Sequence, residues 1–391
     1  MTDGRHRVAL VTSSFHPHVG GVEEHVRQVA LALRAQGHDV VVWTVDRGEH
    51  LGVQTVDGVL VRYLPTPLPS ATPTGVARFA RVAPAAWHAW REALRADRPQ
   101  VLHVHCFGPN GVYAAALART TRIPLVVTSH GETTADDHDA YGRSWLLRTT
   151  LTRAVRRAVC TTAPSQAVLA DLRERFGLEG GSVVPNAVSD AASLGSDSPM
   201  AVVEATADTS PVIVAVGRLE RNKGFDLLVQ ALPSIRAQVP AARLRLGGAG
   251  SQEAALAAQA EGLGLASVVT LLGQLTPSQV AAELAAADVV VVPSRQEAFG
   301  IVLLEAWRAG TALVAPNHGG PAEVVRDGTD GLLVDPTDGP ALATAIVRVL
   351  NDPGYAERLA AAGRARLADY TWPAVARAYA QVYAATGTSA P

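Results

Sequence analysis

Residues 8–45 read VALVTSSFHPHVGGVEEHVRQVALALRAQGHDVVVWTV, and this stretch decides the fold class. Its first run, Val8–Thr12, is apolar, as expected of a strand that is buried on both faces. A polar loop ends at Gly20-Gly21, and apolar residues then recur at helical spacing up to Gln36. Val40–Val45 is the next apolar run. Strand, loop, helix and strand in this order predict a βαβ unit and hence a parallel sheet.

The loop ahead of the first helix lacks the G-x-G-x-x-G pattern, so the dinucleotide-binding fingerprint is absent. Two adjacent glycines at a helix start still let the backbone approach a phosphate or a sugar closely. An ordinary tight turn would need the same residues. Gly20 and Gly21 are therefore candidate ligand-binding residues by position, with the turn as an equal alternative.

The alternation of strands and helices continues along the chain in two series. The first series has further strand-like runs at 58–63, 101–105, 125–129, 158–162 and 182–184. Residues 187–210 are rich in Ala, Ser, Asp and Thr and have weak periodicity, so we interpret them as a linker. The second series has a helix over Phe225–Gln238, which Pro233 should kink or interrupt. Its strand-like runs are at 212–216, 244–246, 268–272, 288–293, 313–315 and 332–334.

Two series of similar size predict an α/β protein with two doubly wound, Rossmann-like domains that face each other across a cleft. We place an N-terminal domain at residues 1–195 and a C-terminal domain at residues 205–370. Residues 371–391 are expected to form a helix that packs back on the N-terminal domain.

Composition narrows the function classes. The chain has 391 residues, 48% hydrophobic and 18% charged, as in folded globular proteins. A net charge of −2 gives no general attraction to nucleic acid or anionic lipid. Cys106 and Cys160 are the only cysteines and predict reduced thiols in a cytoplasmic protein. The basic segment Trp145–Val159 has two interpretations, a helix on a membrane surface or a solvated helix face, and we favour the second.

Lysine is almost absent from the chain. Among 34 lysine and arginine residues, Lys223 is the only lysine. In so biased a composition arginine serves wherever any cation will do. A single retained lysine is then a candidate for a site that needs a compact ammonium rather than a planar guanidinium. Chance retention is the alternative.

Residues 294–310 read SRQEAFGIVLLEAWRAG, a polar loop followed by a short apolar helix. A helix start offers unpaired N–H groups and a positive dipole end, which suit a phosphate. The apolar residues leave little polar face, so we expect the helix to be buried and Glu305 to need a partner. Either Glu297 and Glu305 hold a sugar nucleotide, or Glu297 is a helix-start acid and Glu305 pairs with Arg308.

His130 follows the strand-like run 125–129. Ligands of parallel sheets bind beyond the carboxyl ends of the strands, which is where His130 falls. A purely structural histidine is equally consistent with this position.

Five motifs in order resemble the retaining, nucleotide-sugar-dependent glycosyltransferases of family four, which have the two-domain GT-B fold. They are GGVEEH at 20–25, TSHG at 128–131, PNAV at 185–188, GRLERNKG at 217–224 and EAFGIVLLE at 297–305, the last being the E-x7-E motif of the family. The resemblance covers nearly the whole chain and implies that the domain at 1–195 binds the acceptor and the domain at 205–370 binds the nucleotide sugar. It implies transfer of a hexose or N-acetylhexosamine from a nucleotide diphosphate sugar to a hydroxyl of a small molecule, natural product, glycolipid or glycan.

The resemblance assigns roles at matching positions. Arg218 and Lys223 would bind the donor diphosphate and stabilise its growing negative charge as it leaves. Glu297 would hold hydroxyls of the transferred sugar, and His130 would lie near C6 of that sugar. With Arg218 and Lys223, the donor-binding residues would be Gly20, Gly21, Phe299, Gly300, Ile301 and Glu305, where Glu305 accepts hydrogen bonds from the ribose.

The same resemblance implies neither a cofactor nor a metal, and the sequence has no DxD in a suitable loop and no paired histidines at ligand spacing. It also implies retention of anomeric configuration, by a front-face displacement in which the leaving phosphate helps deprotonate the acceptor hydroxyl. The donor would be a UDP-, GDP- or ADP-sugar, with UDP favoured. The loop Gly247–Ser251 departs from the usual G-x-G-P and leaves the base undetermined.

Other functions and features remain open at this point. A nucleotide-sugar epimerase and a non-catalytic nucleotide-sugar-binding protein of the same fold are the alternatives. A phosphorylated acceptor would need arginines of the first domain, such as Arg78, Arg81 or Arg153, because that domain has no lysine. The sequence does not identify the donor sugar, the acceptor, the pathway or the oligomeric state.

Overall fold

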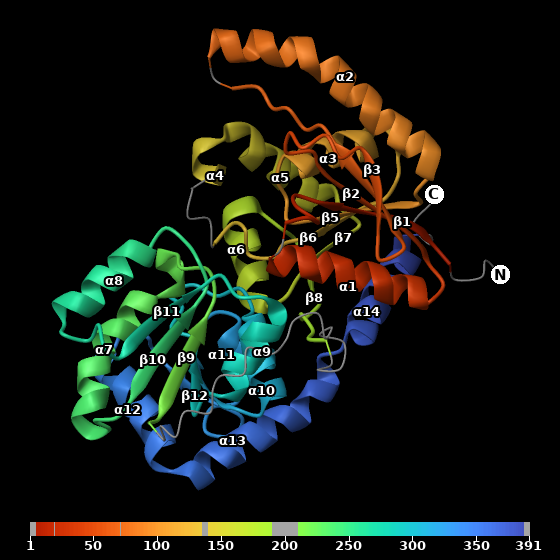
Figure 1. The fold of residues 1–391 in the computed structure, drawn as a ribbon. Coiled ribbons are helices and arrows are strands. Elements are labelled where there is room, and N and C mark those ends of the chain that lie inside the picture. Colours follow the sequence, from red (N-terminus) through yellow and green to blue (C-terminus); the bar gives the residue numbers. More distant parts are fainter. Residues whose placement is uncertain (1–4, 19, 71, 135–139, 190–209, 387–391) are drawn as a thin grey trace. The chain divides into compact units, whose positions relative to one another are not determined.

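The computed structural model describes residues 5–18, 20–70, 72–134, 140–189 and 210–386. The chain divides into two compact units, which are taken separately here (Figure 1). Unit 1 comprises Met1–Asn186 with Trp372–Pro391, and unit 2 comprises Ala187–Thr371. The predicted boundaries at 195 and 205 lie outside the described residues and stay a prediction. No helix among the described residues is both long and apolar enough to cross a membrane.

Unit 1 is built on an eight-stranded sheet in the order β3-β4-β2-β1-β5-β6-β7-β8. Neighbouring strands run parallel except β3, which pairs antiparallel with β4. The strands are β1 (Arg7–Thr12), β2 (Asp39–Val45), β3 (Val53–Val56), β4 (Val59–Leu64), β5 (Val101–His105), β6 (Leu125–Thr128), β7 (Cys160–Ala163) and β8 (Ser182–Val183).

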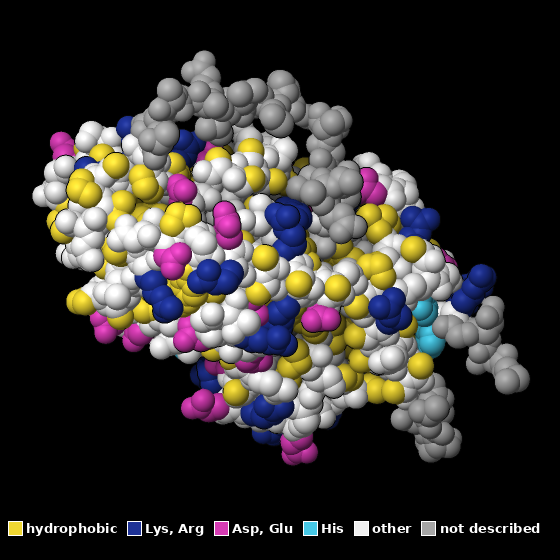
Figure 2. All heavy atoms as spheres, turned by 90° about the horizontal axis from the view of Figure 1, so that it is seen from below, with side chains coloured by type: hydrophobic (Ala, Val, Ile, Leu, Met, Phe, Trp, Pro, Cys, Tyr) yellow, Lys and Arg dark blue, Asp and Glu magenta, His cyan; other side chains and the backbone are white. Residues whose placement is uncertain are grey.

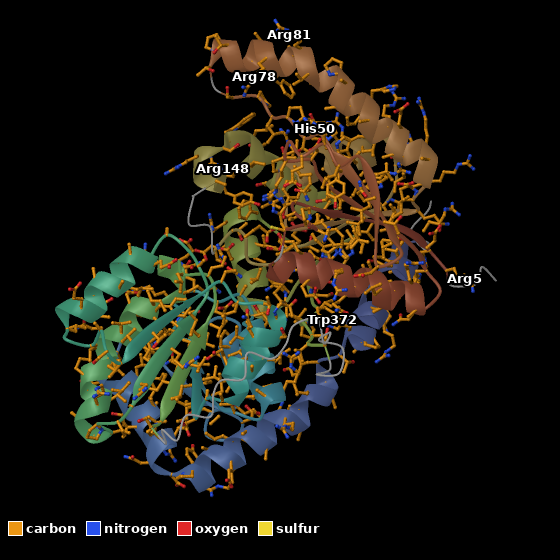
Figure 3. All side chains as sticks on the ribbon, in the orientation of Figure 1. Arg5, His50, Arg78, Arg81, Arg148 and Trp372 are labelled. Atoms are coloured by element: carbon orange, nitrogen blue, oxygen red, sulfur yellow. The ribbon has the colours of Figure 1, made fainter. Side chains whose placement is uncertain are left out.

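Helices cover both faces of this sheet. Its helices are α1 (Gly21–Ala35), α2 (Pro73–Asp97), α3 (Pro109–Thr121), α4 (Ala140–Arg143), α5 (Trp145–Arg157), α6 (Gln166–Phe176) and α14 (Trp372–Thr386). On one face α1 packs against α14, and on the other Trp43 of β2 meets Trp90 of α2 edge-on. The first half of α2 is largely exposed, and Arg78 and Arg81 project from it (Figure 3). The last helix of the chain therefore belongs to the same compact unit as the first strand.

Unit 2 has a six-stranded parallel sheet in the order β11-β10-β9-β12-β13-β14. Its strands are β9 (Val212–Val216), β10 (Arg243–Gly247), β11 (Val269–Gly273), β12 (Val289–Val291), β13 (Ala312–Pro316) and β14 (Leu332–Val334). Its helices are η2 (Arg221–Lys223), α7 (Phe225–Gln238), α8 (Glu253–Gly262), α9 (Pro277–Ala285), α10 (Ile301–Ala309), α11 (Pro321–Val324), α12 (Gly339–Asn351), α13 (Pro353–Arg366) and η3 (Leu367–Asp369).

Two apolar cores, one on each face, explain why the strands of unit 2 read as continuous apolar runs. Ile213 and Ala215 of β9 belong to a core with α7, α8 and α12, while Val214 between them belongs to a core with α10. Successive side chains of a strand point to opposite faces, so a strand covered on both sides must be apolar at every position. The prediction of two doubly wound α/β domains is confirmed.

Three local features differ from the sequence-based reading. Helix α7 continues through Pro233 without interruption. The proline removes one N–H donor, but Leu232 and Ile235 on either side are fully buried and hold the helix on the sheet. The edge strand β3, which has no buried residue, and the helix α6 were not anticipated.

A tight turn places the loops of the candidate site in unit 2. Gly224 ends η2 and begins α7 with φ +68°. A Cβ atom there would lie 2.0 Å from the carbonyl oxygen of Pro293, the second residue after β12. Only glycine therefore allows the backbone after β9 to lie against the backbone after β12.

We expect Gly224→Ala to lower the stability of unit 2 by about 2 kcal/mol or more, because alanine is strained at positive φ and its Cβ overlaps a backbone oxygen. Gly262→Ala is the matched control. Gly262 ends α8, and its Cβ would meet no atom within 4 Å. The control should be neutral or slightly stabilising. Urea unfolding of the two variants measures the difference, and equal midpoints would contradict the close approach.

Candidate active site

The strand order of unit 2 has a topological switch point between β9 and β12. From β9 the chain moves outward through β10 and β11, and from β12 it moves the other way through β13 and β14. Ligands of open parallel sheets bind beyond the carboxyl ends of the strands at such a point. The loop after β9 carries Arg218 and Lys223, and the loop after β12 carries Glu297. The sheet thus brings together residues that are 74 positions apart in sequence.

An ion pair joins the two loops. Lys223 Nζ lies 2.7 Å from Glu297 Oε2, and the hydroxyl of Ser294 donates to the same oxygen at 3.1 Å. The side chains of Lys223 and Glu297 are only 20% and 11% exposed. Oε1 of Glu297 has no partner among the residues that the structure describes. Oε2 therefore holds the Glu297 carboxylate in place, and Oε1 is available to a ligand.

A second set of contacts fixes the loop that carries Glu297. The guanidinium of Arg295 makes two hydrogen bonds to the carboxylate of Asp226, at 2.6 and 2.7 Å. Burial raises the pKa of Asp226, but the hydrogen bonds and charge of Arg295 outweigh it and lower that pKa below its usual value. The N–H groups of Arg295 and Gln296 donate to the carbonyl of Asn222, at 2.8 and 3.2 Å. The Glu297 loop is thus bound to the backbone of the Lys223 turn.

The start of α10 is an open helix end. Gly300, its N-cap residue, has φ +87°, and no side chain in the described part of the chain caps the helix there. From Ile301 to Gly310 every residue is buried or half-buried, which confirms the predicted burial. The N–H groups of the first turn and the positive dipole end therefore suit an anion.

Two glycines that sequence reasoning missed support this helix start. The N–H of Gly320 donates to the carbonyl of Glu297 at 2.9 Å. A Cβ on Gly320 would lie 2.3 Å from the carbonyl oxygen of Ala298, and one on Gly319 would lie 2.6 Å from that of Glu297. The adjacent glycines before Pro321 were the available signal, similar to the pair at 20–21.

The remaining predicted residues of unit 2 lie on the same loops and helix. Arg218 is the second residue after β9 and is exposed. Glu305 is half-buried on α10. Arg308, its suggested partner, donates a hydrogen bond to the carbonyl of Ser189 at 2.8 Å. Both interpretations of Glu305 therefore stay open.

Unit 1 has its own switch point, between β1 and β5, and carries the other predicted residues. Gly20 caps the start of α1 with an extended backbone, and Gly21 is the first residue of that helix. His130 follows β6, and its backbone N–H donates to the carboxylate of Glu132 at 2.7 Å. The same carboxylate accepts from Phe107 N at 2.8 Å and from the hydroxyl of Ser129 at 2.9 Å. Glu132 thus fixes the backbone that presents His130.

His130 belongs to a cluster of histidines that the sequence pattern did not reveal. His105, the last residue of β5, places Nδ1 3.2 Å from Nε2 of His130. The ring of His25, from the second turn of α1, lies edge-on to His130 with the centroids 4.7 Å apart. Trp372, which begins α14 (Figure 3), packs edge-on against His25. Four elements far apart in sequence therefore meet around His130.

Burial keeps these rings neutral. It lowers the pKa of His130 to about 4, and with the charge of His130 it lowers the pKa of His103 on β5 to about 3. For His25 and His105 burial is again the first cause, and neighbouring histidine rings lower the pKa further. At neutral pH His130 is therefore an uncharged ring.

On the face that Figure 2 shows, Lys and Arg side chains are interspersed with Asp and Glu.

Known proteins resemble the chain over nearly its whole length. Residues 200–366 match the family "Glycosyl transferases group 1", and residues 19–191 match "Glycosyltransferase Family 4". A glycogen synthase of Mycobacterium tuberculosis is 34% identical, over 97% of this chain and 94% of that protein. A phosphatidyl-myo-inositol mannosyltransferase of Mycobacterium leprae is 32% identical, over 95% of this chain and 94% of that protein.

A solved structure agrees with these matches. Sucrose-phosphate synthase from Thermosynechococcus elongatus is similar with a TM-score of 0.79 at 25% identity, over 99% of this chain and 100% of that chain.

The neutral histidines predict an acid-labile unit 1. His103 has a folded-state pKa of about 3 against about 6.5 unfolded, so its contribution is complete above pH 6.5 and is lost as pH falls toward 3. The free energy of unfolding should fall by about 1.4 kcal/mol per pH unit for this residue. We expect His103→Gln to lessen that slope between pH 6.5 and 5, as measured by urea unfolding. His50→Gln, at an exposed site, should leave it unchanged; equal slopes in both variants would contradict the prediction.

Proposed function

The chain belongs to glycosyltransferase family 4 and has the GT-B fold, and we propose that it moves a hexose or N-acetylhexosamine from a nucleotide diphosphate sugar to an acceptor hydroxyl. We further propose that the reaction retains anomeric configuration and needs no metal ion. Family membership supports glycosyl transfer from a nucleotide sugar. The observation that carries the finer proposal is the Lys223–Glu297 pair at the switch point of unit 2.

Lys223 and Glu297 supply the two charged groups that a nucleotide sugar needs, a cation for its diphosphate and a carboxylate for the hydroxyls of its sugar. Lys223 and Arg218 bind the diphosphate and stabilise the negative charge that grows on it as the glycosidic bond breaks. Because Lys223 is already held by Glu297, the ammonium needs little reorganisation when the transition state forms. Cationic side chains and the start of α10 then take the part that Mg²⁺ plays elsewhere.

Glu297 holds the transferred sugar. Its Oε2 is taken by Lys223 and Ser294, while Oε1 is available to accept hydrogen bonds from sugar hydroxyls. Two contacts on one oxygen fix the carboxylate, so the position of the sugar relative to the diphosphate is set before the reaction. This is the positioning that a front-face displacement requires.

The backbone at the start of α10 completes the donor site. Phe299, Gly300 and Ile301 offer N–H groups to the sugar and the phosphates, at a helix end that suits an anion. Glu305, one turn into the helix, accepts hydrogen bonds from the ribose hydroxyls. The donor is a UDP-, GDP- or ADP-sugar, and we favour UDP.

Unit 1 supplies Gly20, Gly21 and His130. The glycines allow the backbone at the start of α1 to approach the diphosphate. The neutral His130 accepts a hydrogen bond near C6 of the sugar, and the leaving phosphate helps deprotonate the acceptor hydroxyl. The two relatives are named for different products, a glycogen and a mannosylated phosphatidyl-myo-inositol, so we propose no acceptor beyond a hydroxyl.

Lys223 provides the sharpest test of the proposal. We expect Lys223→Ala to lower kcat about 100- to 1,000-fold, the scale of removing one preorganised donor from a transition state. Lys223→Arg should not restore it, because a guanidinium pairs with both oxygens of a carboxylate and would occupy Oε1 of Glu297. Acceptor-dependent release of nucleoside diphosphate in the presence of EDTA is the measurement, and proton NMR gives the anomeric configuration of the product.

Arg245→Ala is the matched control. Arg245 and Glu283 form an ion pair in the same unit, at 2.6 Å and with side chains 29% and 11% exposed. Loss of the Arg245–Glu283 pair should lower the free energy of unfolding about as much as loss of the Lys223–Glu297 pair does. Turnover should stay within about 2-fold of the wild type. Equal turnover in the Lys223→Ala variant and this control would overturn the assignment, and donor binding without transfer to any acceptor would favour a binding protein.

Glu305 tests the ribose contact separately. We expect Glu305→Ala to weaken binding of UDP about 10- to 100-fold, because hydrogen bonds to a charged group contribute about 1.5 to 3 kcal/mol. Binding of inorganic diphosphate, which has no ribose, should not change. Thermal shift with UDP, GDP, ADP and diphosphate measures both, since a ligand at 100 times its Kd stabilises by about 2.7 kcal/mol. If binding of UDP and binding of diphosphate are weakened equally, Glu305 pairs with Arg308 instead of binding the ribose.

A further inference from the structure

Three histidines of unit 1 converge from three elements. His25 comes from α1, His105 from the end of β5 and His130 from the loop after β6. One ring nitrogen of each lies within 4.8 Å of the corresponding nitrogens of the other two. We propose that His25, His105 and His130 form a binding site for a divalent transition-metal cation, with Zn²⁺ as the best match.

One of the three distances between ligand nitrogens already matches a zinc site. Zn²⁺ binds imidazole nitrogen at about 2.0 to 2.1 Å, so two ligands of a tetrahedral site lie about 3.3 Å apart. Nδ1 of His105 and Nε2 of His130 are already 3.2 Å apart. Neutral imidazole is a ligand that suits zinc, copper and nickel, whereas magnesium and calcium prefer oxygen. Three histidine ligands also leave a fourth position for water.

The protonation states favour a cation. A metal needs the neutral ring, and burial lowers the pKa of all three histidines, so no proton has to be removed at neutral pH. In the metal-free cluster one of His105 and His130 donates a proton to the other. If His105 carries its proton on Nε2 and His130 carries its proton on Nδ1, the lone pairs of His105 Nδ1 and His130 Nε2 are both available to the cation.

His103 shows what a purely structural histidine looks like in this unit. Its Nδ1 contacts the hydroxyl of Tyr383 and its Nε2 that of Thr128, both at 2.6 Å. In contrast, Nε2 of His105 is buried without a hydrogen-bond partner among the described residues, and His25 has, besides Tyr379, only a contact with the side chain of Asn186. Buried polar atoms are normally paired, so these two rings are held less completely by hydrogen bonds than His103 is.

Tyr379 provides an outer contact of the kind that metal sites use. Its hydroxyl lies 3.3 Å from Nε2 of His25. When His25 donates Nε2–H to this oxygen, the lone pair is on Nδ1. Such contacts fix the tautomer and the orientation of a ligand ring.

Occupancy has a consequence that rests on the proposed function. A cation bound to the trio takes the lone pair of His130, which the proposed mechanism places beside the transferred sugar. Zn²⁺ should therefore inhibit transfer with the same midpoint as it binds.

The test measures binding without any substrate. Full-length protein without a polyhistidine tag is stripped with EDTA, and Zn²⁺ is titrated against a chromophoric chelator. We expect one equivalent of Zn²⁺ per chain, and no such binding of Mg²⁺. His105→Phe should weaken binding more than about 100-fold, since loss of an outer contact alone costs 10- to 100-fold. His50→Ala removes a side chain that is 86% exposed (Figure 3) and should leave binding unchanged.

Circular dichroism and thermal melts establish that the variants are folded, and His25→Gln replaces His105→Phe if the latter is not. Co²⁺ provides an independent spectroscopic readout, because a tetrahedral nitrogen site gives intense visible absorption. Absence of a saturable equivalent, or equal affinity in the wild type and both cluster variants, overturns the site. If Zn²⁺ binds but glycosyl transfer is undiminished, the metal site is supported and His130 does not lie at the reaction centre.

Discussion

Holding a lysine ammonium and a glutamate carboxylate 2.7 Å apart in a largely buried place is unfavourable unless both charges gain more than they lose by leaving water. In unit 2 contacts around the pair hold both charges in place. The loop of Glu297 is tied to the turn of Lys223 through the carbonyl of Asn222 and the Arg295–Asp226 pair. The positions of both charges are therefore fixed by contacts other than the pair itself, which leaves the pair free to share its charges with a ligand.

The identity of the cation matters as much as its position. Several arginines of this chain pair with a carboxylate through two nitrogens, as Arg62 does with Asp97 and Arg245 with Glu283. Such a pair uses both carboxylate oxygens and is complete in itself. Lysine is a compact charge with three donors, and Lys223 uses one oxygen of Glu297. Under the proposed function Glu297 keeps one oxygen for the transferred sugar, which accounts for a lysine at this position of an arginine-rich chain.

The features that were predicted correctly from the sequence are those that depend on a local pattern of residues. Apolar runs of strand length and helical spacing gave the two doubly wound domains, and the apolar residues after Gly300 gave a buried helix. The histidine cluster was not predicted, because His25, His105 and His130 are far apart in sequence and meet only through the strand order. Gly319 and Gly320 were missed for a related reason: their need for glycine comes from the carbonyl oxygens of Glu297 and Ala298, which only the folded chain brings near.

The two switch points also differ in physical character. At the switch point of unit 2 the charges are ionised and paired, and the helix start adds a positive dipole. At the switch point of unit 1 burial suppresses charge: the histidine rings are neutral, and burial raises the pKa of Glu132 although hydrogen bonds to its carboxylate oppose the shift. A diphosphate needs the first environment. A neutral hydrogen-bond acceptor beside a sugar, or a ligand for a transition metal, needs the second, because a protonated imidazole can do neither.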